Sequence, residues 1–451
     1  MSVCSDVLSY AQRAGIDECE SVFCSKKTIT IRITDSEIAE VKENFEKSVG
    51  VRIVHEKRIS CLESTVLEPK KIIDDVLSSS QILTKRDFWK SLPSGAKTAP
   101  VKNTNDSKIW DLDSLKASEI ANEMIGASLH QKISRVSGSL NIVCEDFELE
   151  NTSNLQRREK ATYISGIINA DSEEGSRPVS GIGQANSRML AGFDAQKIGS
   201  EAAQMCVNTI NPTGCDAERT SVIFEPLAVG EILTFVLGPN FGLKAYSEKR
   251  SCFSEKLGEQ IAAKEFSLVD DPHIPNGLGT KSFDDEGVPT RENNVVLNGA
   301  FRNTYSDSYN AFKYGGVSSG NACRPGSPLG RATDPIPVAA PHNLTVKSGD
   351  SLRDDIIRDT KKGILVSRLW YTYAVNPIKG DFSCTARSGI FLIENGQIKS
   401  PARSVRIIHN LPVLLKNITA IGNNQRTVLP WAAMPVTAPT IRCDGISVNP
   451  I

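Results

Sequence analysis

The segment 380–401 reads GDFSCTARSGIFLIENGQIKSP, and it decides the class of fold in the second half of the chain. Residues 388–393 are apolar and typical of a strand, the pair Asn395-Gly396 follows, and 397–399 resumes an extended pattern. An Asn-Gly pair between two such runs predicts a β-hairpin, because a type I′ turn needs φ above zero at both central residues. A second pair, Asn298-Gly299, lies between NNVVL and AFRNTY. We therefore predict antiparallel sheet joined by tight hairpins.

Hydrophobic periodicity outlines the other elements, with Gly and Pro at their ends. The pattern S-L-R-D at 351–354 predicts a capping box for a helix that ends before Gly363 as its C′ residue. The Pro-rich end at 428–448 predicts at most edge strands. We expect helices at 3–14, 69–83, 115–130, 193–210, 226–238, 352–362 and 410–421, and strands at 27–34, 50–54, 59–65, within 137–168, and at 220–224, 364–375 and 404–408.

Length bounds the domain organisation. A chain of 451 residues exceeds one ordinary core, so two domains are expected. We place the boundary after the helix at 193–210, which gives an N-terminal α+β domain at 1–211 and a C-terminal antiparallel β-rich domain at 212–451. The segment 315–350 is rich in Gly, Pro, Ser and Asn, and its length predicts a functional loop or a mobile flap.

Charge and cysteine usage indicate a cytoplasmic protein. The net charge is −1, from 52 basic and 53 acidic residues, so nucleic-acid binding is not expected. No apolar run approaches the ~20 residues of a membrane helix, and the start MSVCSDVLSYAQRAG lacks the pattern of a signal peptide. The 11 cysteines, spread from Cys4 to Cys443 without a C-x-x-C, are expected to be reduced thiols.

One acidic trio could carry chemistry. Asp284, Asp285 and Glu286 are adjacent in a segment with too much Gly and Pro for a regular element. They either bind a cation or act as acid and base, or they serve a structural role by capping a turn or pairing with Lys281 and Arg291. The structural interpretation is the more economical one for an isolated trio.

Other candidate residues are single groups. Glu231 is the only charged residue of the apolar helix at 226–238, and we expect it to reach solvent or a hydrogen-bond donor. His273 follows two aspartates, but the nearest other histidine is His342, 69 residues away, so a surface turn is expected. Cys384 has no recognisable activating histidine, and a buried structural side chain is expected. No phosphate loop, dinucleotide fingerprint or nucleophile elbow occurs.

The order of several short segments resembles the TldD/PmbA family, whose members are also called TldE or modulator-of-gyrase proteins. The segment 380–401 resembles the family's glycine-acidic-aromatic-serine and "ENG-x-I-x-x-P" stretches. FDDEGVPT, NGAFRNTYSDSYNAFKYG, SSGNACR and HNLTVKSGD follow the family in the same order, and VGVRIVHEKRISC matches more loosely. The resemblance implies an α+β fold. Its N-terminal domain is like an α/β sandwich with mostly antiparallel strands, and its C-terminal domain is built on a large curved antiparallel sheet.

The resemblance also implies two kinds of subunit. TldD-type chains carry an H-E-x-x-x-H metal motif on a helix and a cysteine ligand near the C-terminus, whereas PmbA/TldE-type chains lack them and pair with the first kind. In the helix at 226–238, Gly230 and Phe235 stand at the two histidine positions and only Glu231 remains. TVLPWAAMPV has no cysteine, and Cys443 lies too far along the chain. This chain therefore resembles the metal-free type, and no catalytic, cofactor or metal residue is assigned to it.

Three functions stay open. The first is a metal-free subunit that forms a metallopeptidase with a zinc-carrying TldD-type homologue and acts on short or unfolded peptides, with a homodimer possible for the chain alone. The second is a non-enzymatic binding protein, such as a topoisomerase modulator. The third is an autonomous hydrolase that uses Asp284, Asp285, Glu286 or Cys384.

Overall fold

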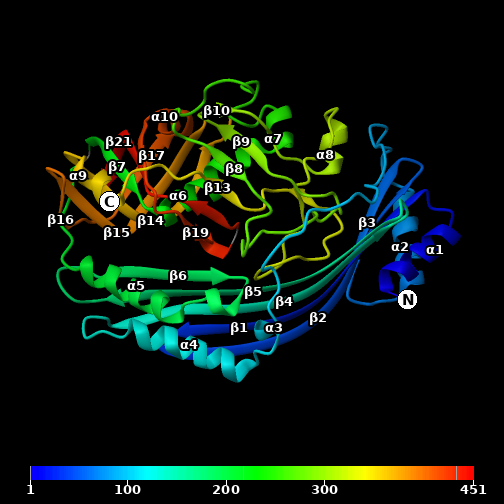
Figure 1. Ribbon diagram of the computed structural model, residues 1–451, viewed down its shortest axis with the longest axis horizontal. Coiled ribbons are helices and arrows are strands. Elements are labelled where there is room, and N and C mark those ends of the chain that lie inside the picture. Colours follow the sequence, from blue (N-terminus) through cyan, green and yellow to red (C-terminus); the bar gives the residue numbers. More distant parts are fainter. Residues whose placement is uncertain (1, 217, 433) are drawn as a thin grey trace.

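The computed structural model describes residues 2–216, 218–432 and 434–451. Figure 1 shows a sheet of long strands with helices along its outer side, and a second β-rich part, from the second half of the chain, on its inner side. The predicted α+β class with large antiparallel sheets is confirmed. No helix in the described part of the chain is long and apolar enough to cross a membrane.

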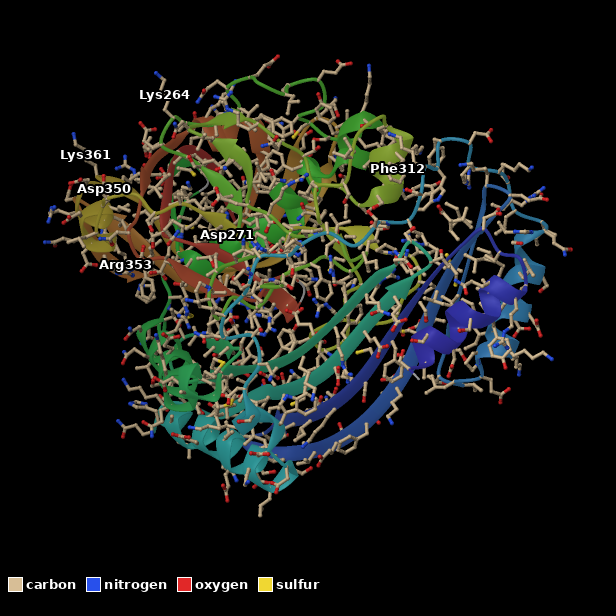
Figure 2. The ribbon with its side chains drawn as sticks, turned by 45° about the vertical axis from the view of Figure 1, so that its right-hand side comes forward. Lys264, Asp271, Phe312, Asp350, Arg353 and Lys361 are labelled. Carbon is tan, nitrogen blue, oxygen red and sulfur yellow. The ribbon has the colours of Figure 1, made fainter. Side chains whose placement is uncertain are left out.

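The N-terminal sheet has six antiparallel strands in the order β3-β2-β1-β4-β5-β6. Several strands are much longer than predicted. The first half of β2, for example, is exposed, and its polar sequence lacks the alternation of a half-buried strand, so periodicity did not indicate it. Figure 2 shows the long strands curving beneath the C-terminal part, with side chains filling the space between them. The strands are β1 (Glu18–Thr34), β2 (Glu37–His55), β3 (Arg58–Ser64), β4 (Arg135–Asn151), β5 (Leu155–Ser172) and β6 (Val179–Ser187).

Helices cover this sheet at two places (Figure 1). One pair packs on β1 and β4–β6 around a core rich in Ile, Val, Leu and Ala side chains, and the other pair packs on β1–β3 at the far end. Gly183 permits the close approach of the first pair, since a Cβ atom there would lie 1.9 Å from the Ile198 carbonyl oxygen. The pairs are α4 (Ser114–Ser128) with α5 (Ala195–Asn208), and α1 (Val3–Arg13) with α2 (Pro69–Ser80); α3 (Ser107–Trp110) is a single turn.

Five strands of the C-terminal domain close into a ring. Each pairs with two neighbours in the order β14-β7-β21-β17-β15 and back to β14, and only the β14–β7 pair is parallel. The prediction of at most edge strands at 428–448 is wrong for β21, which lies between β7 and β17. The strands are β7 (Glu218–Phe224), β14 (Lys362–Asn376), β15 (Asp381–Glu394), β17 (Val405–Asn410) and β21 (Ile441–Pro450), with β16 (Gln397–Pro401) and β18 (Ile418–Ile421) attached at the side.

A second C-terminal sheet packs beside this ring in the order β10-β9-β8-β13-β20-β19. A small pair, β11 with β12, forms within the segment 315–350. The strands are β8 (Leu268–Asp270), β9 (Asn293–Leu297), β10 (Ala300–Phe301), β11 (Ala322–Cys323), β12 (Val338–Ala339), β13 (Leu344–Val346), β19 (Arg426–Val428) and β20 (Val436–Ala438). The short helices are α7 (Leu243–Ser247), α8 (Ser308–Lys313), α9 (Arg353–Arg358) and α10 (Leu411–Lys416).

Both predicted Asn-Gly hairpins are confirmed. Asn395 and Gly396 have φ of 52° and 77° between β15 and β16, and Asn298 and Gly299 have φ of 50° and 76° between β9 and β10. These values are the left-handed conformations that a type I′ turn requires. The turn residues alone therefore determine these connections.

Two helix predictions need correction. Helix α9 is shorter than the predicted 352–362, its N-cap is Leu352 without a side-chain hydrogen bond, and Ser351 instead forms a bridge with Gly422. Gly363 lies in β14 and is no helix cap, because pairing with β7 extends the strand to this point. The predicted helix 410–421 ends at Lys416, where the chain turns into β18.

Candidate functional site around helix α6

The apolar helix predicted at 226–238 is present and buried. It begins as α6 (Pro226–Ile232), with the proline in the first turn, where a missing N–H costs no hydrogen bond. It continues as a wider π-type turn, Leu233–Leu237, and a 3₁₀ turn, Gly238–Phe241. The Tyr305 hydroxyl donates to the Gly238 carbonyl at 2.5 Å and holds this end. Such π segments occur often at functional sites.

Gly230 lies where β19 and β20 pack against α6. A Cβ atom at this position would lie 2.4 Å from Val428 Cγ2 and 3.0 Å from Val436 Cγ2. Both valines belong to the main core of the C-terminal domain and are almost fully buried. Because protein cores are close-packed, a group much larger than a methyl displaces these strands. An imidazole therefore does not fit at position 230.

Glu231 is buried against β14. Its carboxylate accepts a hydrogen bond from the Leu369 N–H at 2.6 Å, which confirms the prediction that it reaches a donor. Burial raises the pKa of Glu231 to about 8, although Arg368, the Leu369 N–H and Trp431 favour the charged form. The Arg368 guanidinium lies 4.3 and 4.9 Å from the ring centroids of Trp370 and Trp431, and these two rings contact each other edge to face. Glu231 thus connects the helix to a strand.

The next turn of the helix faces a cavity of about 380 Å³. Phe235, which stands at the second histidine position of the implied motif, lines this cavity together with Thr234, His342 and Met434. The Thr234 Oγ1 atom is buried and has no hydrogen-bond partner among the described residues. A buried hydroxyl without a partner costs free energy, so this atom is suited to meet a polar group that enters the cavity.

The acidic trio is fully buried and structural. Asp284 accepts hydrogen bonds from the N–H groups of Glu286, Val288 and Ala322 at 2.9–3.0 Å. Burial and the Glu286 charge raise the pKa of Asp284 well above its usual value. Asp285 contacts the Lys281 ammonium at 2.9 Å, which is the predicted pairing. The predicted pairing with Arg291 is wrong, because that guanidinium donates to the Ser318 carbonyl.

Three buried arginines connect the trio to the N-terminal sheet. Arg52 of β2 contacts Glu286 at 2.8 Å and Glu20 at 3.0 Å, and Arg324 contacts Glu20 at 2.6 Å. Arg331 contacts Asp285 at 2.9 Å. Burial disfavours the charges of Asp285 and Glu286, but the cations outweigh it and hold the pKa of each below its usual value.

The segment 315–350 accordingly packs between the domains and carries β11, β12 and β13. Arg331 also contacts Glu145 and Glu159 of the N-terminal sheet, at 3.6 and 2.6 Å. The Thr333 hydroxyl contacts Ser48 of β2 at 2.7 Å. This segment lines the cavity beside Phe235, because 325–331 and 340–342 form much of its wall.

The remaining single candidates lie apart from one another. His273 is half-buried, with its Nε2 3.2 Å from the Thr290 hydroxyl. His342 is buried with Nε2 2.7 Å from the Gly320 carbonyl oxygen, and burial lowers its pKa. Cys384 is fully buried in the core, and burial raises its pKa. Cys443 is likewise buried, in β21. These placements make an activated thiol unfavourable, because burial suppresses the reactive thiolate.

The residues around α6 do not fit a metal ion. In the part of the chain that the structure describes, no three His, Cys, Asp or Glu side chains gather in a way that could hold one. A zinc site needs several such ligands at about 2.0–2.3 Å. At the two implied histidine positions stand a glycine without room for a side chain and an aromatic ring.

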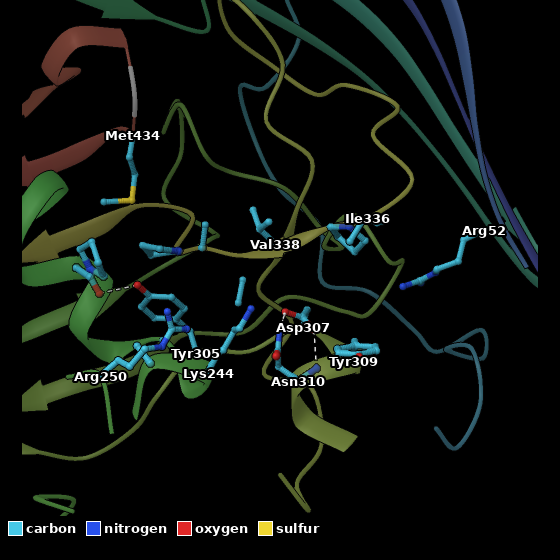
Figure 3. Close-up of a pocket in the computed structure, with 18 of the residues that line it drawn as sticks. Arg52, Lys244, Arg250, Tyr305, Asp307, Tyr309, Asn310, Ile336, Val338 and Met434 are labelled. Atoms are coloured by element: carbon cyan, nitrogen blue, oxygen red, sulfur yellow. Dashed lines mark hydrogen bonds between the residues drawn. The ribbon is translucent and has the colours of Figure 1, made fainter. Parts of the chain in front are cut away.

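A larger cavity of about 680 Å³ adjoins the same helix and the turns that follow it (Figure 3). It shares Thr234, Ala340, Pro341 and Met434 with the smaller cavity, so the two meet at the helix. Sequence reasoning did not identify it, because its lining residues come from distant segments. The one available signal was Arg52, a cation inside the apolar run VGVRIV.

The fold defines an α+β protein with large antiparallel sheets, and the site adds a buried apolar helix with two adjoining cavities. Residues 217–450 match the family model described as the PmbA/TldA metallopeptidase C-terminal domain. The chain belongs to the PmbA/TldD family, as its sequence resemblance predicted.

Curated relatives carry metalloprotease names. The chain is 28% identical over 269 residues, 59% of its length, to a protein named "Metalloprotease" of Methanothermobacter thermautotrophicus. It is 25% identical over 230 residues, 51% of its length, to "Metalloprotease PmbA" of Escherichia coli O157:H7. The matched segments span 57% and 47% of those relatives, or about half of their length.

Solved structures share the whole fold. TldE from Thermococcus kodakarensis superposes with a TM-score of 0.90 at 23% identity, covering 99% of this chain and 100% of that one. A Thermotoga maritima protein described as a candidate modulator of a DNA gyrase superposes with a TM-score of 0.88 at 20% identity, covering 99% of each chain. At these identities the likeness defines the fold alone.

Proposed function

We propose that this chain is the metal-free, PmbA/TldE-type subunit of a two-chain metallopeptidase that acts on short or unfolded peptides. The partner is a TldD-type homologue that carries H-E-x-x-x-H and zinc. This chain contributes the walls of a cavity that admits flexible chains and excludes folded ones. The proposal goes beyond the family assignment in naming the missing metal, the partner and the substrate.

The observation that carries the proposal is the packing at Gly230. A valine methyl occupies the space that an imidazole would need, so the ligand set cannot be restored by a small movement of the helix. Glu231 keeps the position of the general base in the implied motif, but its side chain is buried and accepts a hydrogen bond from the Leu369 N–H.

An exposed apolar face supports a partner of the same fold. Tyr373 of β14 pairs across Ser383 with Ile408 of β17, so their side chains lie on one face of the ring. Tyr373 is 45% and Ile408 53% exposed, and Tyr371 and Val375 beside them are more exposed still. Clusters of exposed apolar side chains often mark interfaces.

Co-expression with an H-E-x-x-x-H homologue tests the proposal. We expect the two chains to co-purify, zinc to be bound by the pair and not by this chain alone, and cleavage of an unfolded peptide only by the mixture. Ile408→Glu is expected to abolish co-purification, whereas Ile82→Glu, at an 88% exposed site of the N-terminal domain, leaves it intact. Stoichiometric metal and unaided cleavage by this chain would refute the proposal.

A non-enzymatic modulator is the alternative, and the description of the Thermotoga maritima relative favours it. The net charge of −1 does not favour direct contact with DNA. In the same co-expression experiment this role predicts that the chain binds no H-E-x-x-x-H homologue and that the mixture cleaves no peptide.

A further inference from the structure

The 680 Å³ cavity lies between the two domains and has four walls. The turns that follow α6, with α7, form one wall, and the start of α8 forms the second. The extended segment 336–341 forms the third, and β2 and β3 with the loop after α2 form the fourth. Cavities of 300–1,000 Å³ at domain boundaries commonly hold ligands.

The charged groups that line the cavity are mostly cations. Figure 3 places Lys244 and Arg250 together beside Tyr305, with Arg52 across Tyr309 on the opposite side. Arg52 is neutralised by two carboxylates. Arg250 contacts Glu248 at 2.8 Å, but this carboxylate also serves Lys313.

Two further cations lack any neutralising partner. Lys244 and Arg86 pair with no carboxylate among the residues that the structure describes. The only acid in the lining is Asp307. It is buried and caps α8 through the Asn310 N–H at 2.8 Å, and burial together with the Glu286 charge raises its pKa. The mouth of the cavity is therefore positive and suited to carboxylates.

The third wall adds apolar surface and an open strand. Ile336 and Val338 line the cavity and remain more than half exposed, at 62% and 52%. Their alternation along an extended segment places both on one side of the backbone. Strand β12 pairs with β11 on one side only within the described chain. An extended ligand with small apolar side chains fits this wall, because an open strand edge accepts a further strand.

The inner end of the cavity holds an unpartnered polar atom. Thr234 is 8% exposed, and its Oγ1 finds no hydrogen bond among the described residues although it lines both cavities. A native core rarely leaves such a hydroxyl without a hydrogen bond, and a ligand or a water usually supplies the missing partner. A peptide group reaching this depth would supply both a donor and an acceptor.

We propose that this cavity binds an extended acidic peptide, with its carboxylates at Lys244, Arg86 and Arg250, small apolar side chains on Ile336 and Val338, and a main-chain group at Thr234. The inference deepens the proposed function, on which its biological meaning rests, by naming acidic segments of the substrate as those that this subunit holds. Lys244, Arg86 and Thr234 act as specificity residues and take no part in bond cleavage.

Fluorescence anisotropy on the full chain, without a partner, tests the inference. The probes are a short labelled peptide that alternates Glu with Ala and Val, and its counterpart with Gln in place of Glu. We expect the Glu peptide to bind more tightly, with an affinity that falls as salt rises. Equal affinities of the two peptides, tighter binding of the Gln peptide, or no binding of either, would overturn it.

Charge-reversal and hydroxyl-deletion variants locate the site. Lys244→Glu should lower the affinity for the Glu peptide about fivefold to tenfold, since charge attraction becomes repulsion. Lys264→Glu makes the same change at an exposed lysine that does not line the cavity, and it should leave binding unchanged. Thr234→Val should weaken the binding of both peptides and leave the salt dependence of binding unchanged. Equal effects of the two lysine variants would contradict the assignment.

The outcome is separable from that of the proposed function. If the chain binds the acidic peptide, Lys244→Glu weakens this binding and the chain fails to associate with an H-E-x-x-x-H homologue, then the binding site stands and the two-chain peptidase is refuted. If the two chains associate and cleave peptides but this chain does not prefer the Glu peptide, then the peptidase stands and the binding site is refuted.

Discussion

Replacing Gly230 by alanine tests whether the implied metal site is packed shut. In a helix interior this change normally stabilises by ~1 kcal/mol, because glycine loses more backbone entropy on folding. Here the new Cβ would lie 2.4 Å from Val428 Cγ2, inside a core that cannot yield freely. Overpacking of this kind costs ~1–3 kcal/mol, and the short distance favours the upper end. We expect a net loss of ~1–2 kcal/mol in the free energy of unfolding.

Gly126→Ala is the matched control. Gly126 lies in helix α4, is exposed, and has no atom within 4 Å of an added Cβ, so only the helix-propensity gain applies. Urea unfolding followed by tryptophan fluorescence compares the two variants, since Trp110 packs against the core under α4 and Trp370 and Trp431 report on the C-terminal domain. Unchanged slopes of the transitions would confirm that the stability itself has changed.

A double mutant isolates the contact. Val428→Ala removes the methyl group that blocks the Cβ, so in that background Gly230→Ala should become neutral or stabilising. The expected coupling is ~2 kcal/mol, within the range for residues in direct contact. If Gly230→Ala stabilises the protein as much as Gly126→Ala does, the helix has room at this position. The packing argument for a metal-free subunit would then be wrong.

Two further predictions concern buried charges. Arg331→Met should destabilise the protein by ~3–5 kcal/mol in urea unfolding, because it leaves three carboxylates without their common cation. Arg158→Met breaks one exposed pair and should cost no more than ~1 kcal/mol. Similar losses in the two variants would contradict the role of the buried network. For Glu231, the folded pKa of about 8 lies above the usual 4.5, so its contribution to stability is full below pH 4.5 and is lost as pH rises towards 8. Glu231→Gln should therefore gain stability relative to the wild type between pH 5 and 8, and parallel pH profiles of the two proteins would contradict the assignment.

The sequence by itself determined the features that depend on neighbouring residues. The Asn-Gly pairs at 298 and 395 specify their turns, because the required φ values are a property of those residues. The apolar run from Pro226 determined a buried helix, and the family resemblance placed Gly230 and Phe235 where the implied motif has its histidines. The ordered motifs also determined the family.

Only the tertiary structure decided the features that join distant segments. Five strands close into a ring, in which β21 lies between β7 and β17, although the Pro-rich sequence around β21 indicates an edge strand. Glu286 of the acidic trio pairs with Arg52 across the domain boundary, and the Arg324–Glu20 pair joins positions 304 residues apart. The lining of the 680 Å³ cavity likewise comes from both domains. Local periodicity records which face of an element is buried but not which partner buries it, because that choice depends on the packing of the whole chain.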